Sequence, residues 1–299
     1  MMKRPIAAAL ACVLVTVSAG RAAKEDPAKD KRTTGELIGA LGGELPYERL
    51  RASKALGARG PKVLPAVLKA LKAKDWKVRR GAADALGAMG ADAKAAVPDL
   101  AKALKDKDAW VRAGAAAALG RVGPLPAESA KALAGLAADP DSWVREEAVN
   151  SLRSATKDKA ILLPAAIAAV KVRDSGWGVR RHAMSILWQH GRAHKPAAPA
   201  LIEMLKHPSE GMWDSSGRAV EMLVGLGEGA KAAPIVAKWL TSKNRGMTRR
   251  AAGCLATIGA AAASAIPALK AVAETDKDKG NREAAKKAIE QIEAAGKKK

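Results

Sequence analysis

Aromatic residues are scarce in this sequence of 299 residues, which has no phenylalanine, one tyrosine and an aromatic content of 3%. β-Sheets favour aromatic and β-branched side chains, whereas alanine and leucine favour helices. Because 48% of the residues are nevertheless hydrophobic, alanine and leucine must supply most of the core. The composition therefore predicts an all-α protein.

Cysteine and recognisable catalytic motifs are also scarce. The only cysteines are Cys12 and Cys254. The sequence has no glycine-rich phosphate loop, no paired-cysteine zinc spacing and no Gly-x-Ser-x-Gly motif. No acid, base or nucleophile stands out as positioned for chemistry. We therefore expect a chain that is not an enzyme and needs no cofactor, metal or small-molecule substrate.

The N-terminal residues 1–23 have the order of a secretory signal. Lys3 and Arg4 are followed by an apolar run from Ile6 to Ala19 and then by small residues. Such a run fits a signal peptide and is short for a membrane span, although a buried N-terminal helix is the alternative. We predict an exported chain, periplasmic or extracellular, with no transmembrane segment after cleavage. Cleavage removes Cys12, which leaves no intramolecular disulfide, and lowers the formal net charge from +22 to +19.

A repeat with steps of 30 to 36 residues fills most of the remaining chain. Its reference position, called position zero, is occupied by Arg49, Arg79, Arg112, Arg145, Arg180, Ser216, Thr248 and Arg282. Alanine follows three residues later in every unit, leucine or isoleucine seven residues later, and glycine eleven residues later in six units. This spacing predicts one buried helical stripe that ends at the glycine.

An earlier helix is expected in each unit, and proline marks its start because proline suits the first helical turn. These prolines are Pro65, Pro98, Pro164, Pro199, Pro234 and Pro267. A single helix pair cannot bury its own apolar face, so the units must stack. We predict about eight stacked helix–turn–helix units over residues 33–295, a charged linker at 24–32 and a lysine-rich tail at 296–299.

The segment Ala96–Gly123, with its Trp110-Val111-Arg112 and its alanine-rich second helix, resembles a bacterial HEAT-like repeat of the phycobilisome-lyase type. The likeness departs at Ser216 and Thr248, which replace the arginine, and at Thr156, which replaces the glycine. The resemblance implies a right-handed, armadillo-like α-solenoid (superhelix) with an interaction surface. It does not imply lyase activity, because one fold serves many functions.

The arginines at position zero are interpreted as structural. In HEAT-like repeats this arginine and an aspartate of the turn resemble a hydrogen-bonded ladder between units, and the aspartates four residues before the arginine fit that role. Contact with a ligand is the alternative. The predicted ladder residues are Asp75, Arg79, Asp108, Arg112, Asp141, Arg145 and Arg180.

Two surface features are candidates for partner binding. One is a row of tryptophans just before position zero, which either anchors a partner or, as we favour, packs over the next unit: Trp76, Trp110, Trp143, Trp177 and Trp213. The other is the polar stripe at positions +1, +5 and +9, which resembles the concave binding surface of HEAT-like solenoids. Its basic residues are Arg80, Arg121, Arg181 and Arg249.

The histidines offer only a weak metal site. His190 and His194 have a helical spacing, but Gly191 should end the helix between them, and no third ligand is placed. We therefore predict no metal site.

Three functions remain in competition. The favoured one is a non-catalytic protein–protein interaction scaffold of the cell envelope, which binds a protein or peptide along the concave surface. The alternative is binding of a polyanion, such as an acidic polysaccharide, lipid headgroups or nucleic acid, through the high positive charge. A lyase-type enzyme is favoured only by the family resemblance. Salt should separate the first two, because binding driven by charge weakens as ionic strength rises.

Overall fold

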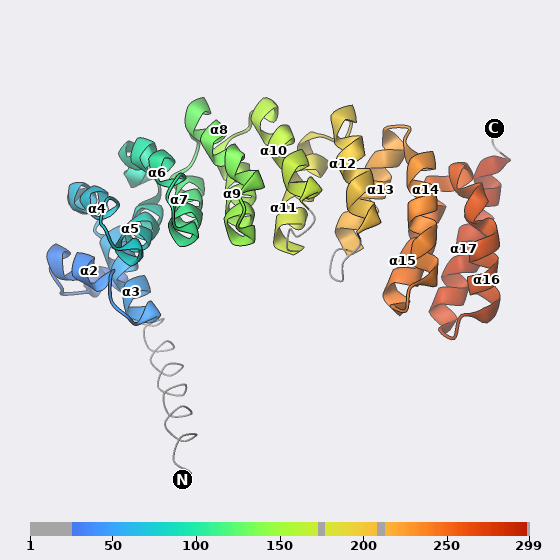
Figure 1. Cartoon of the computed structure of the whole chain (residues 1–299), viewed down its shortest axis with the longest axis horizontal. Helices are drawn as coiled ribbons and strands as arrows, with labels where there is room; N and C mark the ends of the chain where they lie inside the picture. The colour runs from blue at the N-terminus through green and yellow to red at the C-terminus, as the bar shows by residue number, and fades with distance from the viewer. Residues whose placement is uncertain (1–25, 173–176, 208–212, 298–299) are drawn as a thin grey trace, which may run out of the picture. The chain divides into compact units, whose positions relative to one another are not determined.

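The computed structural model describes residues 26–172, 177–207 and 213–297, and every regular element within these residues is helical (Figure 1). The predicted signal segment, residues 1–23, lies outside them. Eight helix pairs follow one another along the described chain: α2 (Thr34–Ala40) with α3 (Pro46–Ala58), α4 (Leu64–Ala70) with α5 (Trp76–Met89), α6 (Val97–Ala103) with α7 (Ala109–Val122), α8 (Ala127–Gly135) with α9 (Ser142–Ala155), α10 (Lys159–Lys171) with α11 (Trp177–His190), α12 (Ala198–Lys206) with α13 (Trp213–Gly225), α14 (Gly229–Ala237) with α15 (Arg245–Ile258), and α16 (Ile266–Thr275) with α17 (Lys279–Gly296). Short 3-10 helices lie between them: η1 (Pro27–Lys29), η2 (Gly60–Val63), η3 (Gly90–Ala96), η4 (Leu136–Ala138), η5 (Lys195–Ala197), η6 (Lys238–Thr241) and η7 (Gly259–Ala265).

The core follows the repeat register. The alanine at position +3 is fully buried in all eight units, and so are the seven leucines at position +7, while Ile289 of the last unit is half-buried. Small residues at +3 bring the two helices of a pair close together, and the leucines fill the space between pairs. The predicted all-α solenoid of stacked helix pairs is confirmed.

The described chain divides into two compact units. The first runs to Leu136 and includes residues 151–156, and the second contains residues 137–150 and the chain from Lys157 onward. Helix α9 contributes its beginning to the second unit and its end to the first. Within each unit the second helices of successive pairs pack against one another, α3 on α5 and α5 on α7 in the first, α13 on α15 and α15 on α17 in the second.

Glycine ends most of the second helices, as the register predicts. Gly60, Gly90, Gly123, Gly227 and Gly259 all have a positive φ, which side chains other than glycine rarely adopt. Gly191 does not have a positive φ. Close packing explains the glycine at this position instead, because a Cβ there would lie 2.7 Å from Cδ2 of Leu163.

Glycine also lets the second helices of the first unit approach closely. Position +8 is occupied by Gly57, Gly87 and Gly120 in the first three pairs. A Cβ on Gly57 would overlap the Cβ of Ala88, and one on Gly120 would lie 2.6 Å from the Cβ of Ser151. The absence of a side chain at +8 is therefore a packing requirement in this unit.

Two of the predicted helix starts are wrong. Pro65, Pro98, Pro199 and Pro267 occupy the first turns of α4, α6, α12 and α16, but Pro164 and Pro234 lie inside α10 and α14. Helix α10 begins earlier because the Asp158 carboxylate accepts the N–H of Ala160, which fixes a start five residues before the proline.

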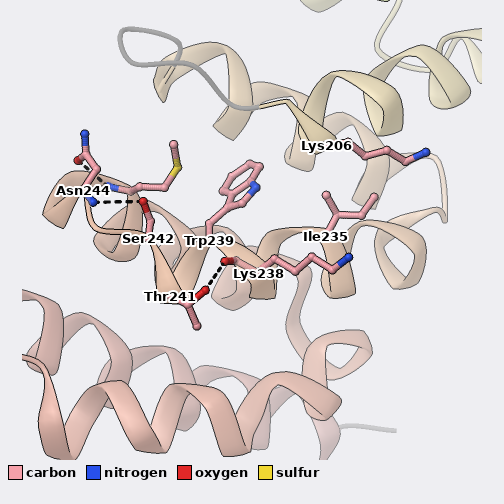
Figure 2. Close-up of a pocket in the computed structure, with 8 residues that line it drawn as sticks. Lys206, Ile235, Lys238, Trp239, Thr241, Ser242 and Asn244 are labelled. Carbon is pink, nitrogen blue, oxygen red and sulfur yellow. Dashed lines mark hydrogen bonds between the residues drawn. The ribbon is translucent and has the colours of Figure 1, made fainter.

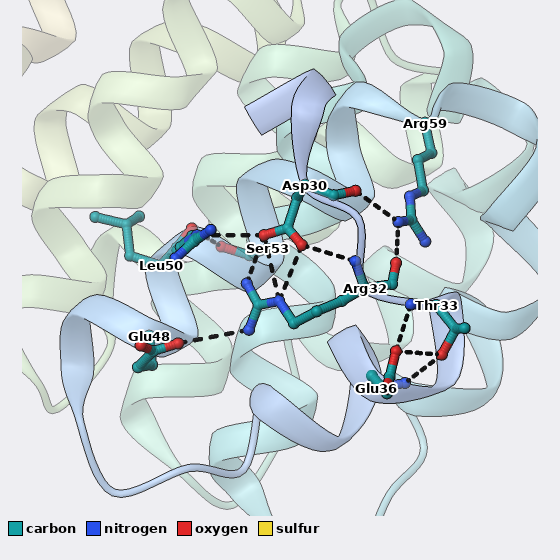
Figure 3. Close-up of polar contacts among 9 residues, drawn as sticks. Asp30, Arg32, Thr33, Glu36, Glu48, Leu50, Ser53 and Arg59 are labelled. Atoms are coloured by element: carbon teal, nitrogen blue, oxygen red, sulfur yellow. Dashed lines mark hydrogen bonds and ion pairs between the residues drawn. The ribbon is translucent and has the colours of Figure 1, made fainter. Parts of the chain in front are cut away.

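Residues 26–32, which the sequence assigns to a charged linker, pack against the first helix pair (Figure 3). The Asp30 side chain is only 3% exposed and pairs with Arg32 at 2.7 Å and with Arg51 of α3 at 3.2 Å. Arg59 at the end of α3 donates to the carbonyl oxygens of Asp30 and Arg32. Hydrogen bonds from Arg32, which outweigh the opposing effect of burial, lower the pKa of Asp30 to about 2.

We expect Asp30→Asn to lower the free energy of unfolding by about 1 kcal/mol, because both arginine partners are partly exposed and can be rehydrated. A folded-state pKa of about 2 lies below the usual unfolded value of about 3.9. The stabilisation is therefore present at neutral pH and is lost as the pH falls below about 4. Thermal unfolding should distinguish variant from wild type at neutral pH and make them converge near pH 2, whereas Glu44→Gln, at an exposed ion pair, should change little. A difference that persists at low pH would contradict this account.

Among the residues that the structure describes, one stretch, Arg245–Thr275, is long and apolar enough to cross a membrane, contrary to the sequence expectation that none exists outside the signal segment. The described structure divides it into α15, η7 and α16, with a break at Gly259, where φ is +68°. Leu255, Ile258 and Leu269 are buried in the helical core. Core packing accounts for the buried part of this stretch, which is 39% of its apolar window.

Candidate interaction surface on the second helices

The second helices expose a polar stripe, as the register predicts for position +5. Lys54, Asn150, Glu221, Gly253 and Lys287 are exposed there. Ala117 of α7 is the buried exception, at 7% exposure. Each second helix thus presents one polar face to solvent and its +3 and +7 face to the core.

A groove of about 620 Å³ lies on this stripe between α15 and α17. Its floor is built from small side chains, including Ala252, Ala256 and Ala288, which leave space between the two helices. Polar side chains line its length, namely Arg249 and Thr257 from α15 and Lys287 and Gln291 from α17. The combination of an apolar floor and polar walls suits an elongated segment of a partner.

Arg249 is held at one end of this groove. Its Nη2 donates to Oδ1 of Asp278 at 3.0 Å, while the side chain stays 58% exposed. The backbone N–H of Asn281 contributes most to lowering the pKa of Asp278, and Arg249 lowers it further. Arg249 is thus both oriented and accessible.

The other three predicted arginines differ in accessibility. Arg80 is half-buried, pairs with Asp84 at 2.9 Å and donates to the carbonyl of Trp110 at 2.8 Å. Arg121 is exposed on α7, and Arg181 is exposed on α11 with Nη2 3.2 Å from Nε2 of His182. Of these three, Arg80 is the least suited to contact a partner, because its guanidinium already bridges α5 and α7.

The tryptophan row is described only in part. Trp76 and Trp110 stack with ring centroids 6.4 Å apart and an interplanar angle of 30°. Trp110 is 54% exposed and Trp143 is half-buried. The side chains of Trp177 and Trp213 lie outside the described residues. In the first unit, the rings therefore pack on each other across consecutive helix pairs and still leave one indole open to solvent.

The arginine ladder uses a different acid from the one expected. Arg79 is 8% exposed and forms a bidentate pair with Asp106 of the next turn, at 2.7 and 2.8 Å. Asp75, Asp108 and Asp141, four residues before the arginines, instead accept backbone N–H groups at the starts of α5, α7 and α9. The pairing acid stands six residues before position zero, because the aspartate at −4 is engaged as a helix cap.

The arginines also hold the turn of their own unit. Nη1 of Arg79 donates to the carbonyls of Ala73 and Lys74, and the same pattern recurs for Arg112 and Arg145. Arg180 donates to the carbonyl of His207 at 3.2 Å. These side chains occupy the turns rather than the exposed stripe.

The histidines and Cys254 offer no obvious chemistry. His190 is the last residue of α11 and His194 follows the break at Gly191. No group of three or more metal-ligating side chains exists among the residues that the structure describes. Cys254 is buried, and its burial raises the thiol pKa to about 11, so the thiolate is scarce at neutral pH.

Sequence reasoning missed two features of the second unit. One is a pocket of about 640 Å³ with Trp239 between Lys206 and Asn244 (Figure 2). The other is Trp188 at position +8, whose ring makes cation–π contacts with two arginine side chains. The replacement of glycine by tryptophan at +8 was a signal in the sequence that could have identified the second feature.

A comparison with protein families supports the helical repeats. A family model described as HEAT repeats matches residues 36–96 and 91–153. No curated protein matches the chain. Similar solved structures include an engineered protein, at 21% identity over 87% of this chain and 88% of that chain with a TM-score of 0.38. They also include the complex of CpcE and CpcF of phycocyanin lyase from Nostoc sp. PCC7120, at 23% identity over 78% and 94% with a TM-score of 0.40.

Those two likenesses are too distant to bear on function. The family match covers the second and third helix pairs and parts of their neighbours, and the same buried alanine and leucine positions continue through α17. Residues 36–153 are HEAT-like repeats, and the helix pairs that follow repeat the same register.

Proposed function

We propose that this chain is a non-catalytic scaffold that binds a protein or peptide along the exposed stripe of its second helices. HEAT repeats point to protein interaction in general. The observation that carries the specific proposal is the groove between α15 and α17, with its alanine floor and polar walls. Apolar side chains of a partner would lie on Ala252, Ala256 and Ala288, while its polar groups would meet Arg249 and Gln291.

The perturbed titratable groups support a structural rather than a catalytic role. Asp30 and Asp106 have lowered pKa values because arginines pair with them, and Asp278 is lowered chiefly as a helix cap. Cys254 is shifted by burial away from the reactive thiolate. None of these four side chains combines a shifted pKa with a place in either described cavity.

The proposed location is the cell envelope or the exterior, on the strength of residues 1–23 alone. Polyanion binding is the second candidate, supported by the formal charge of +19 after cleavage. The stripe itself carries acids as well, with Glu221 exposed on α13 and Glu283 exposed on α17. This mixture of signs favours a protein partner over a uniformly charged polymer.

Filling the groove should abolish partner capture. Gly253 is exposed in the middle of α15 with nothing within 4 Å of a Cβ added there, so Gly253→Leu blocks the groove without displacing a neighbour. The mature chain, from residue 24, would be immobilised and exposed to an envelope extract of the source cell at low and high salt. We expect one protein to be retained at both salts by the wild type and lost by Gly253→Leu.

Gly225→Leu is the matched control, because Gly225 is also exposed and also has no atom within 4 Å of an added Cβ. It should retain the same partner as the wild type. Retention of polyanions alone, and only at low salt, would sink the scaffold proposal. Equal capture by both leucine variants would place the partner elsewhere than in this groove.

A further inference from the structure

Trp188 replaces the glycine that lets second helices approach closely in the first unit. Position +8 is Gly57, Gly87 and Gly120 in the first three helix pairs and Trp188 in α11. An indole cannot occupy the contact that those glycines make, so it lies at the surface and is half-buried. The second unit therefore has an aromatic platform where the first unit has helix-to-helix contact.

Two guanidinium groups share this platform. The Cζ atom of Arg192 lies 3.5 Å from the centroid of the Trp188 ring, and that of Arg218 in α13 lies 5.8 Å from it. Both distances are within the range of cation–π attraction, and the closer one places Arg192 directly over the ring. The indole thus holds together two like charges that come from different helix pairs.

Neither arginine has a carboxylate partner among the side chains that the structure describes, which exclude residues 1–25, 173–177 and 208–214, and both are exposed. Arg79, Arg80 and Arg249, in contrast, each pair with an aspartate. Two guanidinium groups held near each other without an acid repel one another, and an added anion relieves that repulsion. Among these described side chains, the cluster is therefore charged, oriented and without a counter-charge.

We propose that Trp188, Arg192 and Arg218 bind a carboxylate side chain of an acidic segment in the protein partner. A guanidinium stacked on an indole keeps its N–H groups directed outward in the plane of the fork, the geometry that a carboxylate meets with two parallel hydrogen bonds. The nature of the occupant rests on the proposed function, since it assumes a protein partner.

The surrounding charge favours a single carboxylate over a polyanion. Glu221 is exposed on α13, three residues after Arg218 and so on the same side of the helix. A polymer with a charge at every step would be repelled there, whereas an isolated acidic side chain can sit on the arginines and avoid it. The positive patch is therefore local rather than continuous.

The test uses the mature chain and a fluorescein-labelled peptide that carries one glutamate among serines and glycines, with the same peptide carrying glutamine in its place as the neutral comparison. We expect fluorescence anisotropy to show binding of the glutamate peptide, and Arg192→Gln and Arg218→Gln each to weaken it about tenfold. Trp188→Leu should weaken it to a similar degree by removing the platform. Lys102→Gln removes the same charge from an exposed lysine of α6, outside the stripe of the second helices, and should change affinity less than about twofold.

Equal weakening by Lys102→Gln and Arg192→Gln would overturn the inference, because only the net charge would then matter. So would equal affinity for the glutamate and glutamine peptides, or an effect of Arg192→Gln on a sulfated oligosaccharide alone. Circular dichroism checks that each variant is folded, and the two arginine variants carry the test should Trp188→Leu unfold. Loss of the natural partner in Gly253→Leu together with unchanged peptide binding in Arg192→Gln would remove this inference and leave the proposed function intact. Unchanged capture of the natural partner by Gly253→Leu, together with weaker peptide binding by Arg192→Gln, would exclude only the groove as the binding site.

Discussion

Replacing Arg79 with alanine should lower the free energy of unfolding by about 3 kcal/mol, the largest effect we expect of any single surface-proximal charge. The guanidinium makes two hydrogen bonds to Asp106 and two to turn carbonyls, and the side chain is almost fully buried. Alanine would leave Asp106 charged, poorly solvated and without its partner. Because the Asp106 side chain retains 13% exposure, some water can reach it, which keeps the cost at the lower end for a buried pair.

Urea unfolding followed by circular dichroism measures this cost. Arg249→Ala, which removes an arginine from the exposed pair with Asp278, is the control and should change stability little. Arg79→Lys keeps the charge but loses the two-pronged geometry, so it should fall between wild type and Arg79→Ala. Equal stability of Arg79→Ala and Arg249→Ala would show that the pair of Arg79 with Asp106 does not contribute to the free energy of unfolding.

The acid limb of the stability curve offers a second readout for Arg79→Ala. Burial raises the pKa of Asp106, but hydrogen bonds from Arg79 and from the N–H of Asp108 outweigh it and leave the pKa lowered. A lowered folded-state pKa gives stability that is present above the unfolded pKa of about 3.9 and lost as the pH falls through the folded value. Without Arg79 the effect of burial dominates, so the deficit of the variant should shrink as the pH falls below about 4.

Alanine at Gly57 should destabilise the chain by about 2 kcal/mol, although glycine to alanine inside a helix normally stabilises. An added Cβ would overlap the Cβ of Ala88 in α5 and approach the carbonyl oxygen of Ala85 to 3.3 Å. Both are too short or rigid to move away, so the helices themselves must separate. The overpacking cost therefore exceeds the gain in helix propensity.

The same substitution at Gly253 should have the opposite sign. This glycine is exposed within α15 and has no atom within 4 Å of an added Cβ, so only the propensity gain of about 0.5 to 1 kcal/mol remains. Thermal or urea unfolding of the two variants side by side checks the prediction. A stabilised Gly57→Ala would mean that α3 and α5 can separate at no cost, which would remove the packing requirement assigned to position +8.

The repeated core of this chain was predictable because every unit buries the same residue types at the same positions. Alanine at +3 and leucine at +7 recur at every step, and a stripe of that period has one buried arrangement. The helix starts predicted at Pro164 and Pro234 are wrong because proline only prefers the first helical turn and does not require it. An N-cap residue such as Asp158 can start the helix several residues before the proline.

The candidate site was less predictable because the pairing of surface side chains depends on their positions in space, which sequence spacing does not determine. Both Asp106 and Asp108 were visible in the turn, but only the structure shows which one caps α7 and which one reaches Arg79. Arg80 looked accessible from its place in the register, yet Asp84, one helical turn away, was an available signal that it would be paired. Trp188 was overlooked because it lies outside the row formed by the other tryptophans.

The bridge from Arg79 to Asp106 also has a mechanical meaning, since it ties one helix pair to the turn of the next. Ser216 and Thr248 stand at the same position in α13 and α15, both nearly buried, and their short hydroxyl side chains cannot span that distance. Under a pulling force, the junctions that follow these two pairs lack this buried tie, and the junction after α15 has instead the exposed pair of Arg249 with Asp278. Those two junctions of the second unit should therefore extend before a junction that is tied by a buried, bidentate arginine pair.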